Sequence, residues 1–319
     1  MEKTRSTAEA QPTLFAVLAA FAAVYFIWGS TYLGILFAIE TIPPFTMAGL
    51  RFLSAGAILF AWTYRRGAPW PTWVQWRSAL VVGGLLLVFG NGLLTWAEKI
   101  VPSGVAALIV ATVPLWMVVL EALRPGGNKP GAPVVLGLLL GLAGIAILIG
   151  PEQIGGAPVD PLGAAVICIA SFSWALGSIY SKSAPQVSST LQNVGMQMLL
   201  GGTLLLAGGF ALGERIDLAG VSARSAWALL YLSIVGGIVS YSAYVWLLKV
   251  STPAKVSTYA YVNPVVAVLL GWGLAGEALD SRVLLASIAV ITAVFLITSA
   301  RKRQPREEGN KSDELRKRK

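Results

Sequence analysis

The stretch Ser257-Thr258-Tyr259-Ala260-Tyr261-Val262-Asn263-Pro264 lies inside an apolar run that extends over residues 255–275. It places two phenols, an amide and a helix-breaking proline ring where apolar side chains would have the lowest free energy of burial in a membrane helix. The residue pattern of this region also occurs 150 positions earlier: Trp96, Lys99, Gly104 and Pro114 correspond to Trp246, Lys249, Ala254 and Pro264. The repetition indicates a chain of two related halves, and the polar stretch belongs to the second.

The composition identifies the class of protein. With 319 residues, of which 56% are hydrophobic and 12% are charged, the chain is more apolar than an ordinary soluble domain. A bilayer core about 30 Å thick requires about 20 apolar residues per helical crossing, so the chain has room for about ten spans. These numbers predict an all-α membrane protein in a lipid bilayer, without a separate soluble domain.

Cysteine and histidine usage limits the chemistry. The chain has one cysteine, Cys168, and no histidine. It therefore lacks a disulfide partner, the commonest metal ligand and the usual proton-shuttling side chain. We expect no disulfide, no metal site and no cofactor. An enzyme is also disfavoured, because the apolar runs contain no close acidic pair.

The net charge of +9 is concentrated at the C-terminus. Nine of the 24 basic residues follow Ser299. In a membrane protein such a tail is typical of an orientation signal that also attracts anionic lipid headgroups. We therefore expect a lipid partner and no nucleic acid.

Ten apolar runs are separated by proline, glycine or charge, and we expect each to be a helix. They cover about residues 14–37, 45–63, 78–97, 103–123, 132–150, 160–181, 190–211, 225–247, 255–275 and 282–299. We expect the first run to be retained, because no small-residue cleavage site follows a short apolar core. With both termini cytoplasmic, 19 basic residues fall on the inner side and four on the outer side, and Arg51 alone lies within a span.

The predicted organisation is a tail over residues 1–12, a first repeat over 13–150, a second repeat over 151–300 and a basic tail over 301–319. Five spans per half is an odd number, so the second half must enter the membrane from the opposite side. Gly29, Ser30 and Tyr32 recur as Gly177, Ser178 and Tyr180. Two inverted repeats around a site near the midplane are typical of transporters that alternate their access.

Polar and aromatic residues spaced i, i+4 give four of the expected helices a distinct face. The pairs are Trp28 with Tyr32, Asn91 with Thr95, Trp174 with Ser178 and Tyr259 with Asn263; Tyr241 takes the repeat position of Asn91. We predict that the rings enclose a small amphiphilic substrate, while Asn91, Thr95, Ser178 and Asn263 bind its polar head. The alternative, favoured for any single serine or threonine, is a hydrogen bond that only holds the bundle together.

Prolines and charges in the spans leave alternatives open. Pro114 and Pro264 are predicted to act as hinges or as static kinks. Arg51 is expected to bond to helix-end carbonyls or to Glu40, with binding of a substrate carboxylate as the alternative. The acids Glu98, Glu121 and Glu277 fall towards span ends and give little support to proton coupling. Glycines such as Gly201 and Gly202 are interpreted as helix-packing residues.

Several short motifs together resemble a known family. They are Ile27-Trp28-Gly29-Ser30-Thr31-Tyr32, Ala48-Gly49-Leu50-Arg51-Phe52, Gly90-Asn91-Gly92, Pro102-Ser103-Gly104, Ala111-Thr112-Val113-Pro114, Ser173-Trp174-Ala175 and the run from Tyr259 to Gly271. Over residues 14–300 the chain resembles the EamA type of the drug/metabolite transporter (DMT) superfamily. One departure is that the Gly-Glu after the fourth helix of a repeat is present as Gly276-Glu277 but replaced by Arg124-Pro125-Gly126-Gly127 in the first half.

The resemblance implies a multi-pass exporter of metabolites, amino acids or drugs in the bacterial inner membrane. It also implies that the first, third, fourth, sixth, eighth and ninth helices surround a central cavity, with the fifth and tenth peripheral. A membrane-embedded binding or sensory protein without transport is the alternative function. The sequence leaves the choice between monomer and homodimer open.

Overall fold

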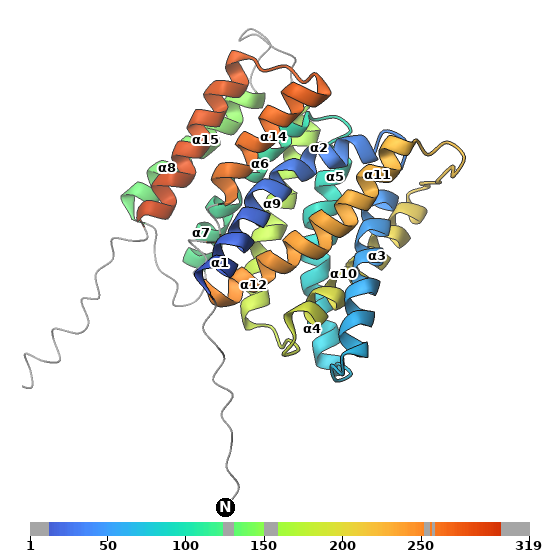
Figure 1. Cartoon of the computed structure of the whole chain (residues 1–319). Coiled ribbons are helices and arrows are strands. Elements are labelled where there is room, and N and C mark those ends of the chain that lie inside the picture. The colour runs from blue at the N-terminus through green and yellow to red at the C-terminus, as the bar shows by residue number, and fades with distance from the viewer. Residues whose placement is uncertain (1–12, 124–130, 150–158, 252–255, 257–258, 301–319) are drawn as a thin grey trace, which may run out of the picture.

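The structure, a computed structural model (Figure 1), describes residues 13–123, 131–149, 159–251, 256 and 259–300. Within these ranges all regular secondary structure is helical and no strand occurs. The expectation of an all-α protein is confirmed. The predicted tails over 1–12 and 301–319, the segment Arg124–Gly127 and residues Ser257 and Thr258 lie outside the described residues.

The helices follow the apolar runs closely. In the first half they are α1 (Leu14–Ala22), η1 (Ala23–Ile27), α2 (Trp28–Ala38), α3 (Pro44–Arg65), α4 (Trp73–Gly83), η2 (Gly84–Gly92), α5 (Leu93–Ala97), α6 (Ser103–Val110), α7 (Val113–Leu123) and α8 (Ala132–Ile149). In the second half they are α9 (Pro161–Ser183), α10 (Thr190–Ala211), α11 (Ala223–Tyr231), η4 (Leu232–Tyr241), α12 (Ser242–Val250), α14 (Tyr259–Ala275) and α15 (Ser281–Ala300).

Seven helices in the described part of the chain are long and apolar enough to cross a bilayer. They are Leu14–Ala38, Pro44–Arg65, Trp73–Ala97, Ser103–Leu120, Pro161–Ser183, Thr190–Ala211 and Ala223–Val250. Shorter apolar helices occur within α8, α14 and α15. The chain is thus a multi-pass membrane protein by length and composition, and the count of ten spans stays a prediction.

Helix starts are set by local sequence. Pro44 and Pro161 occupy the first turns of α3 and α9, where a missing N–H costs nothing. The Asp160 carboxylate accepts from the Gly163 N–H at 2.9 Å and caps α9. Each of these residues ends a loop at the point where an apolar run begins. The helix boundaries therefore agree with the runs to within a few residues.

Three of the long helices contain a π-helical segment near their middle, namely η1, η2 and η4. A π-helical turn carries one more residue than an α-helical turn, which redirects the side chains beside it and is frequent at functional sites. The segment η2 contains Asn91, η4 ends at Tyr241, and η1 ends directly before Trp28. All three segments therefore lie at predicted site residues.

Two close helix pairs frame the bundle. The helices α3 and α10 pack side by side, and so do α8 and α15, which lie together at one edge of the fold in Figure 1. Gly202 of α10 faces the backbone of α3, since a Cβ atom built there would lie 2.5 Å from the Leu53 nitrogen. The interpretation of Gly202 as a packing residue agrees with this contact.

The two repeated prolines occupy different local structures. The helix before Pro114 is interrupted at Ala111 and Thr112, and the Leu115 N–H donates to the Thr112 carbonyl at 2.8 Å as α7 begins. Pro114 is the second residue of α7, so its missing N–H breaks no bond there. Pro264 instead lies within α14, and the helix continues through it. Pro264 therefore removes one backbone donor from the interior of a continuous helix.

Candidate functional site

A cavity of about 70 Å³ lies at the centre of the bundle. Its walls come from both halves of the chain, and they are lined by Trp28, Thr31, Tyr32, Ile35, Arg51, Phe52, Leu87, Gly90, Asn91, Leu94, Val110, Val113, Ala170, Ser171, Trp174, Gly236, Tyr241, Tyr259 and Asn263. We call it the central cavity. No described residue of α8, α10 or α15 lines it, whereas α3 contributes Arg51 and Phe52. The cavity is mostly apolar, with a few polar groups, as small-molecule sites usually are.

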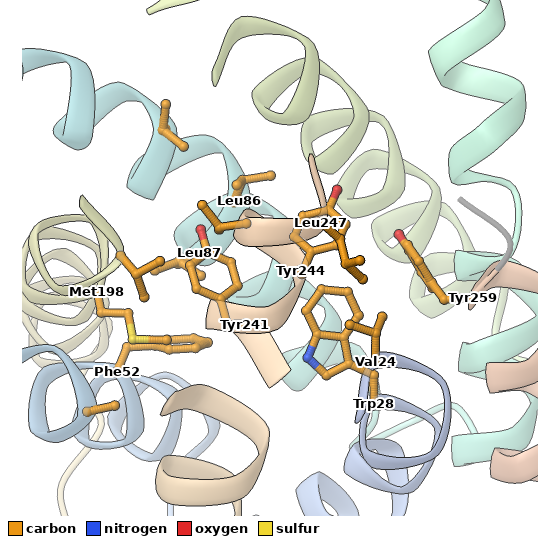
Figure 2. Close-up of a cluster of buried hydrophobic side chains, with 14 of the residues drawn as sticks. Val24, Trp28, Phe52, Leu86, Leu87, Met198, Tyr241, Tyr244, Leu247 and Tyr259 are labelled. Atoms are coloured by element: carbon orange, nitrogen blue, oxygen red, sulfur yellow. The ribbon is translucent and has the colours of Figure 1, made fainter. Parts of the chain in front are cut away.

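Five rings meet at one side of the central cavity, and we call them the aromatic cluster: Trp28, Trp174, Tyr241, Tyr244 and Tyr259. Figure 2 shows four of them among the buried apolar side chains of the bundle. The Trp28 ring lies 4.8 Å from the Tyr244 ring and 5.3 Å from the Tyr259 ring, measured between centroids. Trp174 meets Trp28 edge-on at 5.6 Å. Edge-on and tilted pairs at these distances contribute about 0.5–1.5 kcal/mol each beyond the area they bury.

Two hydroxyls fix the cluster to neighbouring helices. The Tyr241 hydroxyl donates to the Gln197 Oε1 of α10 at 2.7 Å, and the Tyr244 hydroxyl shares a hydrogen bond with the Ser178 hydroxyl of α9 at 3.0 Å. Neither Tyr244 nor Gln197 is among the residues predicted from the sequence. Tyr244 follows Tyr241 by three positions, which places both rings on one face of a helix and is the signal that could have identified it.

A second cavity, of about 480 Å³, lies beyond Tyr244. Its lining residues are Val82, Leu86, Ser181, Lys182, Ala184, Gln186, Gln197, Tyr244, Val245, Leu248 and Lys249. Tyr244 lines this second cavity while its ring contacts Trp28, Trp174 and Tyr259, which line the central cavity. The aromatic cluster therefore stands between the two cavities.

Seven of the nine predicted binding residues line the central cavity, and they come from α2, η2, α9, η4 and α14. They are Trp28, Tyr32, Asn91, Trp174, Tyr241, Tyr259 and Asn263. Thr95 is fully buried, and its hydroxyl donates to the Asn91 Oδ1 at 3.4 Å. Ser178 bonds to Tyr244 instead of facing the cavity. For Thr95 and Ser178 the structure thus displays the bundle-holding contacts that were the alternative interpretation.

Asn263 also has a bond to a neighbouring helix. With its amide nitrogen turned towards them, the side chain donates to the Tyr25 carbonyl at 2.9 Å and to the Tyr259 carbonyl at 3.2 Å. The first bond joins α14 to η1. Asn263, the residue before the proline of α14, therefore ties this cavity-lining helix to the segment that directly precedes Trp28.

Arg51 is a buried cation in the wall of the central cavity, 3% exposed. Its Nε donates to the Leu232 carbonyl at 3.1 Å, so the expected bond to a carbonyl is present. The expected alternative partner, Glu40, pairs with Arg224 at 3.2 Å. The Arg51 Nη1 has no hydrogen-bond partner, and the guanidinium lies 4.8 Å from the centre of the Phe52 ring. One face of this cation is thus satisfied by the protein and one is not.

The acids at the span ends have different environments. Glu277 accepts from the N–H groups of Ser103 and Gly104 and from the Ser103 hydroxyl at 2.6–3.1 Å, which caps α6. Glu98 directly follows the span Trp73–Ala97, is 2% exposed, and has no hydrogen-bond partner at either carboxylate oxygen. Burial and the charge of Glu277 raise the pKa of the Glu98 carboxyl, and the charge of Arg51 partly offsets this rise.

Known proteins resemble the chain over most of its length. The model of a family described as the EamA-like transporter family matches residues 14–150 and 161–299. The inner membrane transporter YedA of Escherichia coli (strain K12) is 41% identical over 286 residues, which cover 89% of this chain and 91% of YedA. Protein PecM of Dickeya dadantii (strain 3937) is 28% identical over 89% of this chain and 95% of its own length.

A solved crystal structure has a similar fold. It aligns with a TM-score of 0.64 at 22% sequence identity, and the alignment covers 91% of this chain and 99% of the other. At this identity the likeness concerns the fold alone. A similar helical fold therefore also occurs in an experimentally determined structure.

Proposed function

This chain belongs to the EamA-like transporter family, and from that premise we propose that it exports small amphiphilic metabolites across the bacterial inner membrane by alternating access. The substrates we propose are amino acids, aromatic compounds or drugs. In this proposal ten spans form two inverted five-helix repeats, both termini are cytoplasmic, and the protein has no enzymatic activity.

The central cavity is the observation that carries the proposal. Most of its lining is apolar or aromatic, and its few polar side chains, among them Asn91 and Asn263, are spread over different helices. Such a lining suits a ligand with a flat apolar body and one polar head. Because both halves of the chain contribute to its walls, a relative movement of the halves would change access to the ligand.

The aromatic cluster suggests where access is controlled. Tyr244 separates the central cavity from the larger second cavity, so a ligand passing between them must displace its ring. At about 70 Å³ the central cavity is smaller than a cavity of about 150 Å³, which holds one benzene molecule. A substrate with a ring must therefore widen it. Pro264 lies five residues after Tyr259, and bending of α14 there would move the Tyr259 ring away from Trp28.

The alternative function is binding or sensing without transport. The accessibility of an introduced thiol from the two sides of the membrane distinguishes it from transport. Ser171 lines the central cavity and its hydroxyl has no hydrogen-bond partner, so Ser171→Cys in a Cys168→Ala background is a mild change. Ile169 lies on the same helix and is 57% exposed, so Ile169→Cys is the control on the outer surface of the bundle. We expect a membrane-impermeant thiol reagent to modify the thiol introduced by Ser171→Cys from both sides of the membrane under turnover. If the reagent modifies this thiol from one side only under every condition, the transport proposal is wrong.

Transport itself is tested in liposomes. Purified protein is expected to accelerate efflux of at least one compound from a panel of amino acids, aryl acids and dyes, and Asn263→Ala is expected to slow it. The physical reason is that Asn263 both lines the cavity and joins α14 to η1. If no compound of a broad panel moves faster than in protein-free liposomes, the proposed function is wrong.

A further inference from the structure

The wall of the central cavity includes buried polar groups that have no hydrogen-bond partner in the protein. The Arg51 Nη1 and the Ser171 hydroxyl both lack a hydrogen-bond partner, and both residues line the cavity. An unpaired buried hydroxyl costs about 1–3 kcal/mol and an unpaired buried charge costs more. A fold tolerates such groups where a ligand satisfies them.

Arg51 cannot relieve this cost by losing its proton, because a guanidinium stays charged in proteins. Within the described residues Arg51 has no ion pair, and the acid Glu40 is paired with Arg224 instead. Glu98 is near enough for its charge to act on Arg51, yet its carboxylate makes no hydrogen bond with the guanidinium. The charge of Arg51 is thus balanced only at a distance.

The surroundings of Arg51 fit its guanidinium closely. A Cβ atom at residue 236 would lie 3.1 Å from the Arg51 Nη2, so glycine at this position lets the η4 backbone pack beside the guanidinium in the wall of the central cavity. The Leu232 carbonyl holds Nε, which fixes the orientation of the plane. A planar guanidinium with one nitrogen hydrogen-bonded to the protein and another without a partner has the geometry to bind a carboxylate.

The cavity lacks a countercharge for a cationic ligand. None of its described lining residues is aspartate or glutamate. An organic cation there would meet the Arg51 charge in a medium of low dielectric constant, where repulsion is strong. An organic anion would be attracted by the same charge, and its apolar part would contact the aromatic cluster.

We propose that Arg51 is the carboxylate-binding residue of the central cavity and that the ligands of this cavity are organic carboxylates with a flat apolar body. The assignment rests on the proposed function in so far as the cavity is the substrate pathway. It narrows the substrate class to molecules with a carboxylate, including zwitterions, and excludes cations without one.

The test compares acids with their neutral amides. Purified protein in detergent is titrated with benzoate, phenylacetate, 3-phenylpropionate and indole-3-propionate, and with the primary amide of each, and ligand binding is measured as a rise in the unfolding midpoint. We expect at least one acid to stabilise the wild-type protein more than its amide. Arg51→Gln should weaken binding of that acid about tenfold to hundredfold, with the amide changed by less than about threefold.

Controls separate the carboxylate contact from loss of charge or fold. Arg224→Gln removes a cation from the half-exposed ion pair with Glu40 and should leave acid binding unchanged. Arg51→Lys keeps the positive charge but loses the two parallel N–H donors of the guanidinium. Its affinity for the acid should therefore lie between those of the wild type and Arg51→Gln. If Arg51→Gln does not fold, the comparison of wild type with Arg51→Lys decides. Equal binding of every acid and its amide by the wild type, or unchanged acid binding by Arg51→Lys and Arg51→Gln, overturns the assignment.

The outcome is distinguishable from failure of the proposed function. If acids bind in an Arg51-dependent manner but no compound crosses liposome membranes, the transport proposal fails and the carboxylate site stands. If neutral or cationic compounds are transported while no acid binds better than its amide, transport stands and the carboxylate site fails.

Discussion

Substitution of Gly202 by alanine should push α10 away from α3, the helix that carries Arg51. A Cβ atom at Gly202 would lie 2.5 Å from the Leu53 nitrogen, 2.9 Å from the Leu53 Cα and 3.0 Å from the Gly49 carbonyl oxygen. All three atoms belong to the backbone of α3, which cannot turn aside as a flexible side chain does. Contacts between heavy atoms are most favourable at about 3.5–4.0 Å, so α3 must move by about 1 Å relative to α10.

The size of the effect follows from two opposing terms. Overpacking of a close contact costs about 1–3 kcal/mol, and the rigid backbone places this contact at the upper end of that range. Alanine gains about 0.5–1 kcal/mol over glycine in a helix interior. We therefore expect Gly202→Ala to lower the unfolding free energy by about 2 kcal/mol. Gly208 lies on the same helix with nothing within 4 Å, so Gly208→Ala should raise it by about 0.5–1 kcal/mol.

The assay is chemical unfolding of both variants in detergent, followed by circular dichroism. Gly49 and Leu53 flank Arg51 on α3, so Gly202→Ala should also weaken binding of aryl carboxylates while Gly208→Ala leaves it intact. Equal shifts of the unfolding midpoint in the two variants, with the same sign, would refute the argument from close packing.

Substitutions at three further residues test individual buried polar groups. Tyr244→Phe should lower the unfolding free energy by about 1 kcal/mol, because it loses only the bond to Ser178, whereas Tyr244→Ala should cost about 3–5 kcal/mol; chemical unfolding measures both. Glu277→Gln should destabilise by about 2 kcal/mol, since a neutral amide caps α6 more weakly than a carboxylate, and the same titration would contradict this if the midpoint did not move. Burial raises the pKa of the Glu98 carboxyl in the folded protein, so the unfolded chain releases this proton first and stability should fall as pH rises above the ordinary glutamate pKa of 4.5. Glu98→Gln should remove that slope in unfolding midpoints measured at a series of pH values, and an unchanged slope would show that Glu98 is not its source.

The helices could be predicted because the bilayer imposes one strong constraint. Apolar runs bounded by residues such as Pro44 and Pro161 begin and end where loops must leave the hydrocarbon, and the helix bounds follow them closely. The π-helical segments η1, η2 and η4 could not be predicted in this way. One additional residue within a turn changes neither the length nor the hydrophobicity of a run, although it redirects the side chains around Trp28, Asn91 and Tyr241.

The site was predictable where a large side chain also carries a polar group, because such a side chain is costly to bury in a packed helix bundle. Trp28 and Trp174 meet that condition, and both line the central cavity. Thr95 has the same i, i+4 spacing from Asn91, but a hydroxyl is small enough to be satisfied by a neighbour on its own helix. The repeat could not identify Tyr244 as it does Tyr241, because the two halves share the positions of their helices more than the chemical type of their side chains.

The two repeated prolines also show that equivalent positions in the two halves differ in local structure. Pro114 and Pro264 stand at equivalent repeat positions, yet Pro114 follows a break in its helix, where no donor is needed, and Pro264 lies inside α14, where the helix loses a bond. A segment beside an existing break can bend without a further change in helical hydrogen bonding, whereas a bend in α14 moves Tyr259 and Asn263 together. We therefore expect Pro264→Ala to slow transport more than Pro114→Ala, since it straightens the helix that carries both a ring of the aromatic cluster and the bond to η1. Equal slowing by both variants in the liposome assay would mean that the two halves move alike despite their different chemistry.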